Sequence, residues 1–86
     1  MYKDVVGVEC LDGLRLRLTF EGNERRDVDV SELVPLDGVF EALRDQSFFR
    51  RVRVNPEIGT IVWPNGADLC PDVLYEKSRP VPTKGC

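Results

Sequence analysis

The most distinctive stretch of the sequence is Trp63-Pro64-Asn65-Gly66-Ala67-Asp68-Leu69, which is followed by Pro71 and by Leu74-Tyr75. It combines a large indole, a turn and the start of a helix. Pro64-Asn65-Gly66 has the chemistry of a turn, and Pro71 suits the first turn of a helix, where a backbone N–H is not needed. The stretch therefore predicts a strand that ends at Trp63, turns, and leads into a short helix that includes Tyr75.

This stretch has one structural reading and two functional ones. In the structural reading, Trp63 fills the core and Asp68 binds backbone donors near the final helix, as short polar side chains do. The first functional reading is an exposed recognition surface lined by Trp63, Asn65, Asp68 and Tyr75. The second is catalysis by Asp68 with Asp72 or Glu76, although no second ligand type and no nucleophile accompanies these carboxylates. We favour the structural reading.

Upstream, residues 14–20 show the clearest strand pattern, because leucines and Phe20 alternate with polar side chains. A second apolar run, residues 5–11, precedes it, and Asp12-Gly13 separates the two. A two-residue Asp-Gly turn would place Val8 opposite Arg17. A three-residue loop over residues 12–14 instead pairs inward positions with inward positions, so we prefer it, with Gly13 left-handed. The predicted pairs are Cys10–Leu16, Val8–Leu18 and Val6–Phe20.

Residues 24–30 predict a third, more polar strand with Val28 and Val30 facing inward. Ser31 is expected to cap a short helical turn over residues 31–34, which Pro35 ends. Residues 39–44 then have apolar side chains at helical spacing, which predicts a short helix over one face of the sheet.

Phe48 and Phe49 are expected to open a second β region. Within it, Val52 and Val54 alternate with Arg51 and Arg53. Residues 55–59 form a turn and residues 60–63 return as a hairpin.

The predicted fold class is α+β, with the order three antiparallel strands, short helix, two-stranded hairpin and short C-terminal helix (β3-α-β2-α). Residues 1–78 are expected to form a single domain. Residues 79–86 have no periodicity and are predicted to be a flexible tail.

Composition narrows the function classes. The chain of 86 residues has 42% hydrophobic and 31% charged residues, which is typical of one soluble globular domain. It contains no histidine, the usual general base near neutral pH and the commonest metal ligand. Without a nucleophile–base set, we expect no enzymatic activity, no catalytic residues, no metal and no cofactor.

The cysteines and the N-terminus indicate the cellular setting. Cys10, Cys70 and Cys86 are an odd number with no close spacing, so we expect neither a disulfide framework nor a zinc site. No apolar run approaches the roughly 20 residues of a membrane-spanning helix. The N-terminus lacks the features of a secretory signal. We therefore expect a cytoplasmic protein with no membrane contact.

Taken together, these features resemble a bacterial family of small proteins, domain of unknown function 2442. The resemblance runs from about Tyr2 to Glu76. Its strongest part is the segment from Gly59 to Leu69 with Pro71, Leu74 and Tyr75. The other matching pieces are Leu16-Arg17-Leu18-Thr19-Phe20 with Gly22, and Asp29-Val30.

The resemblance implies a small α+β fold without an established activity. Some members place this module before a helix-turn-helix domain. Others are single-domain proteins encoded beside another small protein, an arrangement that looks like a toxin–antitoxin pair. This chain is expected to be of the second kind, so we expect a non-catalytic interaction module, the antitoxin-like or regulatory partner of a neighbouring small protein. A homodimer through the exposed edge of the first hairpin is a further option.

The candidate interaction surface combines outward arginines with polar and aromatic residues of the distinctive stretch: Arg15, Arg17, Arg51, Arg53, Trp63, Asn65, Asp68 and Tyr75. One alternative is a ligand-binding protein or carboxylate-dependent enzyme with a pocket near Asp68 and Tyr75. A second is nucleic-acid binding through Arg50, Arg51 and Arg53 beside two phenylalanines. The net charge of −3 makes direct nucleic-acid binding an unfavoured reading, because phosphate contacts need a basic face.

Overall fold

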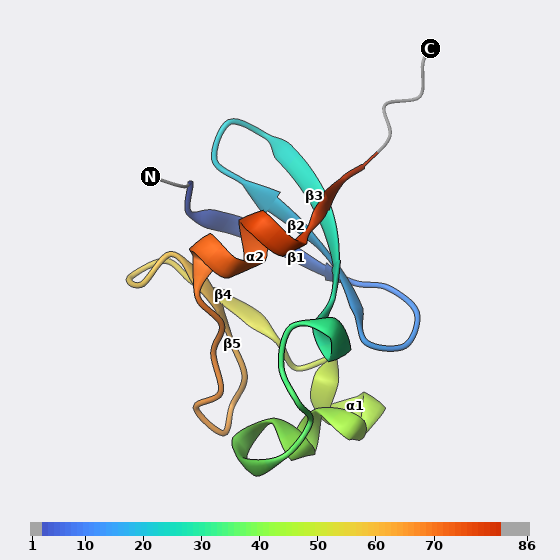
Figure 1. Ribbon diagram of the computed structural model, residues 1–86. Coiled ribbons are helices and arrows are strands. Elements are labelled where there is room, and N and C mark those ends of the chain that lie inside the picture. The colour runs from blue at the N-terminus through green and yellow to red at the C-terminus, as the bar shows by residue number, and fades with distance from the viewer. Residues whose placement is uncertain (1–2, 82–86) are drawn as a thin grey trace.

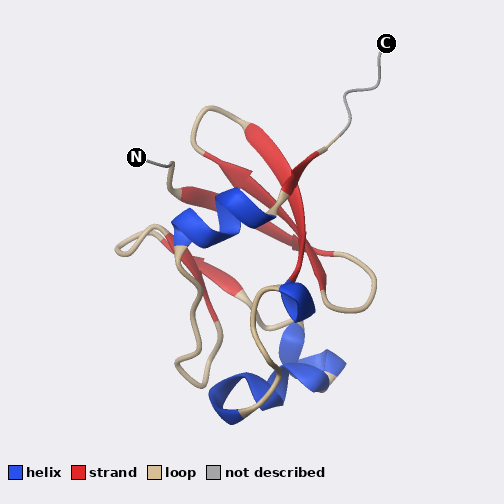
Figure 2. Cartoon of the chain, viewed as in Figure 1, coloured by secondary structure: helices blue, strands red, loops and turns tan. Residues whose placement is uncertain are grey.

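A computed structural model describes residues 3–81 of the chain. Its strands form a four-stranded antiparallel sheet in the order β1-β2-β3-β6 and a separate hairpin, β4-β5 (Figures 1 and 2). The predicted α+β class and the order of its main elements are confirmed. The large sheet contains β1 (Val5–Cys10), β2 (Arg15–Phe20), β3 (Glu24–Asp29) and β6 (Arg79–Pro80), and the hairpin contains β4 (Arg53–Asn55) and β5 (Thr60–Val62).

The first hairpin has the predicted three-residue loop. Leu11 N–H donates to the Arg15 carbonyl at 2.9 Å, and Gly13 has a φ of 59°. That left-handed conformation favours glycine. Cys10 and Val8 pair with Leu16 and Leu18 as expected.

The far end of this hairpin differs from the prediction. A β-bulge lies between Val5 and Gly7, so Val5, and not Val6, stands opposite Phe20. Val5 is buried, whereas Val6 is 55% exposed. The predicted Val6–Phe20 pair is therefore wrong, because one extra residue in a strand reverses the faces beyond it.

After β3 the chain forms short helices whose bounds differ from the predicted ones. The 3-10 helix η1 (Val30–Glu32) is capped by Asp29, whose carboxylate accepts from the Ser31 N–H at 3.0 Å. The N-cap is thus Asp29, two residues before the predicted cap at Ser31. Val28 and Val30 are buried, as predicted.

The next two helices lie away from the face of the large sheet. The 3-10 helix η2 (Gly38–Arg44) and α1 (Gln46–Phe49) gather beyond the end of the sheet at which β3 leads into η1 (Figure 1). The predicted helix over residues 39–44 exists, but it is α2 (Pro71–Lys77) that crosses the sheet face.

The predicted β region beginning at Phe48 is wrong, because Phe48 and Phe49 belong to α1. Asp45 caps this helix by accepting the Ser47 N–H at 3.0 Å. The cap starts a helical turn that overrides the β-propensity of two adjacent phenylalanines. Arg51 consequently lies in a turn, and only Arg53 occupies a strand position.

Residues 79–81, which lie within the predicted tail, instead pair with β3. Arg79 and Pro80 form β6, which pairs with Asp27 and Arg26 of β3. The Val81 N–H continues this pairing by donating to the Arg25 carbonyl at 3.1 Å. Residues 82–86 lie outside the described part, so the tail prediction remains a prediction there.

One hydrophobic core joins the sheet, the hairpin and the helices. Its fully buried side chains come from every part of residues 3–81: Val5, Leu16, Leu18, Phe20, Val30, Leu43, Phe49, Ile61, Trp63 and Leu74. None of the helices in this part of the chain has the length and apolar character needed to cross a membrane.

Candidate functional site

Trp63 is a core residue. Its side chain is 2% exposed, its ring lies 5.9 Å from that of Phe49, and its indole N–H donates to the Phe49 carbonyl at 3.0 Å. The indole therefore links the end of β5 to α1 while satisfying its one polar group. The structural reading of Trp63 holds, and it lies outside any exposed surface.

Asn65 and Asp68 differ in how their side chains are used. The Asn65 amide is used at both ends, because its oxygen accepts from the Ala67 N–H at 3.1 Å and its nitrogen donates to the Val39 carbonyl at 2.9 Å. Asp68 is exposed, and its carboxylate accepts no hydrogen bond from any residue between 3 and 81. The prediction that Asp68 binds backbone donors is therefore wrong, because Asn65 closes this turn.

Tyr75 belongs to a polar network that sequence reasoning missed. Its hydroxyl donates to the Glu24 carboxylate at 2.8 Å, and its ring edge meets Phe20 at 5.0 Å between centroids. The Arg26 guanidinium lies 4.3 Å from the Tyr75 ring centroid and donates to the Ser78 hydroxyl at 2.7 Å. This network fastens α2 and the start of β6 to β3.

The network sets the ionisation of Glu24. Hydrogen bonding, first from Tyr75 and then from Lys3 and Arg26, holds the pKa of the Glu24 carboxyl below its usual value of 4.5, although partial burial opposes the shift. A lowered folded-state pKa means that the carboxylate adds stability above the unfolded pKa. This stability is lost as the pH falls through the lower folded-state pKa.

We therefore expect the stability difference between the wild type and Glu24→Gln to depend on pH. The wild type should be the more stable protein at pH 7, and its advantage should shrink once the pH falls below about 4.5. Asp27 and Asp45, whose pKa values are also lowered, titrate in both proteins and cancel in the comparison. Urea unfolding at pH values from 7 to 3 measures the difference. An advantage that stays constant or grows with acid would contradict the assigned role of Glu24.

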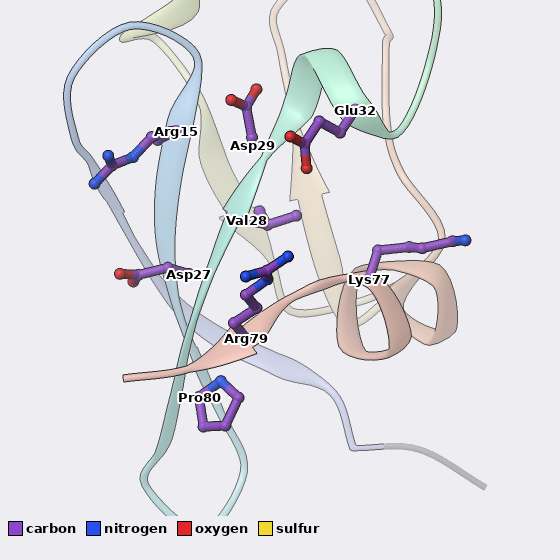
Figure 3. A pocket seen from close by; sticks show the side chains of 8 residues that line it. All are labelled: Arg15, Asp27, Val28, Asp29, Glu32, Lys77, Arg79 and Pro80. Atoms are coloured by element: carbon purple, nitrogen blue, oxygen red, sulfur yellow. The ribbon is translucent and has the colours of Figure 1, made fainter. Parts of the chain in front are cut away.

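A wide charged hollow of about 500 Å³ opens where β3, η1, α2 and β6 meet. We call it the charged hollow, and it is lined by Arg15, Asp27, Val28, Asp29, Glu32, Lys77, Arg79 and Pro80. Figure 3 shows the guanidinium of Arg79 and the carboxylate of Glu32 turned toward Val28, whereas the Lys77 side chain points away along the rim. The hollow therefore has an apolar floor, and side chains of both charges lie around it.

Several charged side chains of this hollow have no ion-pair or hydrogen-bond partner within the described part of the chain. Asp27 is paired with Arg17 at 2.8 Å, and an Asp29 oxygen accepts from Ser31. The side chains of Glu32, Lys77 and Arg79 make no hydrogen bond or salt bridge with any residue from 3 to 81, and the same is true of Arg15. Glu32, Lys77 and Arg79 therefore remain available to another molecule, whereas the charge of Arg15 also acts on Asp27, whose pKa it helps to lower.

The arginines chosen from the sequence do not all line the charged hollow. Arg15 lines the charged hollow, and Arg17 lies beside it in its pair with Asp27, which also lowers the pKa of that carboxyl. Arg51 and Arg53 are exposed on the segment that follows α1. Glu32, Lys77 and Arg79 were missed, because no local pattern signals that η1, α2 and β6 converge.

A second hollow, of about 450 Å³, lies between β1 and the β4–β5 turn. We call it the bulge hollow, and it is lined by Asp4, Val5, Val6, Glu21, Val54, Pro56 and Gly59. Neither hollow is lined by Asp68 or Tyr75, so the alternative pocket near those residues has no support from either. No three Cys, Asp or Glu side chains among residues 3–81 are placed to hold a metal ion.

Comparison with known families bears on this geometry. A family model described as a protein of unknown function, DUF2442, matches residues 5–80 of the chain. The chain belongs to the DUF2442 family. The match ends at Pro80, so the DUF2442 unit includes β6 and every residue that lines the charged hollow. No curated protein matches the chain, and no solved structure does.

Proposed function

We propose that this DUF2442 protein is a non-catalytic interaction module of the cytoplasm, the antitoxin-like or regulatory partner of a small protein encoded beside it, and that it binds this partner at the charged hollow. The observation behind the proposal is that several charged side chains on that surface have no ion-pair partner among residues 3–81. Arg15, Lys77, Arg79 and Glu32 line this hollow and form no salt bridge or hydrogen bond through their side chains with residues 3–81, although the charge of Arg15 helps to lower the pKa of Asp27. Complementary charges on a partner steer association and fix its orientation.

The chemistry of the chain supports a binding role over a reaction. The sequence has no histidine, and burial raises the pKa of the Cys10 thiol, so this cysteine stays protonated at neutral pH. Trp63 and Asn65 are engaged in holding the fold. The distinctive stretch therefore mainly supplies the scaffold; its one exposed charged side chain, Asp68, does not line the charged hollow.

Co-expression with the product of the adjacent gene, followed by titration calorimetry, tests the proposal. We expect a complex in which Arg79→Ala raises the Kd about tenfold or more, as arginine anchors in interfaces do. Glu32→Lys should weaken binding and change its salt dependence. Arg53→Ala removes another exposed arginine, from β4, and should leave the Kd unchanged.

Thermal unfolding of each variant separates loss of binding from loss of fold. The absence of a complex at micromolar concentrations would overturn the proposed function. A complex that Arg53→Ala weakens more than Arg79→Ala does would overturn the assignment to the charged hollow.

A further inference from the structure

The bulge in β1 places an apolar side chain on the surface. In a regular strand Val6 would face the core, but the extra residue turns it outward to 55% exposure, where it lines the bulge hollow. Ile58, in the β4–β5 turn, is 48% exposed next to the hollow residue Gly59. Bulges recur where a strand re-aims a side chain beside a functional site, and grouped exposed apolar residues mark binding surfaces.

The turn is held against β1 and gives the hollow a fixed wall. The Val5 N–H donates to the Gly59 carbonyl at 2.9 Å. Gly59 has a φ of 69°, a left-handed conformation that favours glycine, and the Asp4 carboxyl packs against it. Val54 and Pro56 add apolar wall on the β4 side.

The rim of the bulge hollow is acidic. Asp4 and Glu21 line it, and Glu57 follows Pro56 in the turn. None of these three carboxylates forms a salt bridge with any residue from 3 to 81. Lys3 does not neutralise them, because its ammonium is paired with Glu24 at 3.2 Å.

We propose that the bulge hollow docks a segment of another protein in which apolar side chains are flanked by lysine or arginine. The apolar side chain covers Val6 and Ile58, and the flanking cations meet Asp4, Glu21 and Glu57. The charge of the rim selects this occupant over an acidic one, since like charges across an interface oppose binding. This site is separate from the charged hollow and does not depend on the proposed function.

The probe is the end-blocked hexapeptide Lys-Lys-Val-Leu-Lys-Lys, titrated into the ¹⁵N-labelled full chain and followed by NMR. We expect saturable shift changes at Val6, Val54 and Gly59 and none at the charged hollow. The peptide Glu-Glu-Val-Leu-Glu-Glu should not bind. Val6→Ser removes exposed apolar area and should raise the Kd about fivefold. Val73→Ser, on an exposed valine of α2, should leave it unchanged.

A second variant tests how much the acidic charge of the rim contributes to binding. The double change Asp4→Asn with Glu21→Gln keeps an acceptor for the Asp4 N–H, which bonds to Glu21 at 3.3 Å, and removes two of the three acidic charges, leaving Glu57. It should weaken binding and reduce its salt dependence. Equal binding of the basic and acidic peptides, shifts centred on the charged hollow, or no saturable binding would each overturn the proposal. None of these outcomes bears on the separate proposal that the neighbouring protein binds at the charged hollow.

Discussion

Trp63→Ala is expected to lower the free energy of unfolding by about 3–5 kcal/mol, the range for deleting a buried large aromatic. The indole is 2% exposed, contacts the Phe49 ring and satisfies its N–H at the Phe49 carbonyl. Its loss opens a cavity where β5 meets α1 and removes one of the two donors to that carbonyl, which keeps only the longer bond from the Val52 N–H at 3.3 Å. For a domain of this size such a loss is a large share of the total stability.

Urea unfolding followed by circular dichroism measures this effect, because Trp63 is the only tryptophan available for fluorescence. Trp63→Phe keeps most of the apolar volume and should cost less than Trp63→Ala. The matched control is Asp68→Ala, an exposed position in the same stretch, which should change the stability by no more than about 0.5 kcal/mol. A loss at Asp68 as large as that at Trp63 would contradict the division of this stretch into core and surface.

The second large effect separates two neighbouring valines. Val5→Asp is expected to cost about 3–5 kcal/mol, because it buries a charge without a partner opposite Phe20. Val6→Asp should change the stability by no more than about 0.5 kcal/mol, because Val6 is 55% exposed.

This pair of variants tests the bulge directly, since both place the same residue in the same strand. Chemical unfolding of the two proteins under identical conditions gives the comparison. A regular β1 without the bulge would give the reverse order, with Val6→Asp the more damaging change.

The parts of the fold that could be predicted are those with local signals. The alternation through β2 fixes which side chains face inward, and the register of Leu16 and Leu18 then selects the three-residue loop. Pro71 and the turn at Asn65 and Gly66 likewise mark the start of α2 from residue type alone.

The missed features depend on contacts between distant segments. The bulge at Val6 accompanies the bond from Val5 to Gly59, and the Asp45 cap decides the conformation of Phe48 and Phe49. β6 is too short to show the alternation of a strand, so the sequence pattern places Arg79 in the predicted tail.

The candidate site was less predictable than the fold. Tyr75 and Glu24 lie 51 positions apart in the sequence, and no spacing rule links them. The charged hollow likewise draws one to three residues from each of several elements. Arg15 could be predicted because the alternation along β2 shows which of its side chains face outward. Glu32, Lys77 and Arg79 could not be predicted, because only the folded topology brings η1, α2 and β6 together.

The most direct test of the account is amide hydrogen exchange on the complex with the neighbouring protein, read at single-residue resolution. The account predicts slower exchange on binding at the charged hollow, from residues 27–33 and 77–81, and unchanged exchange at residues 64–68 of the distinctive stretch. Protection confined to residues 64–68 would show that this stretch is itself the recognition surface, and the division between scaffold and binding face would be wrong.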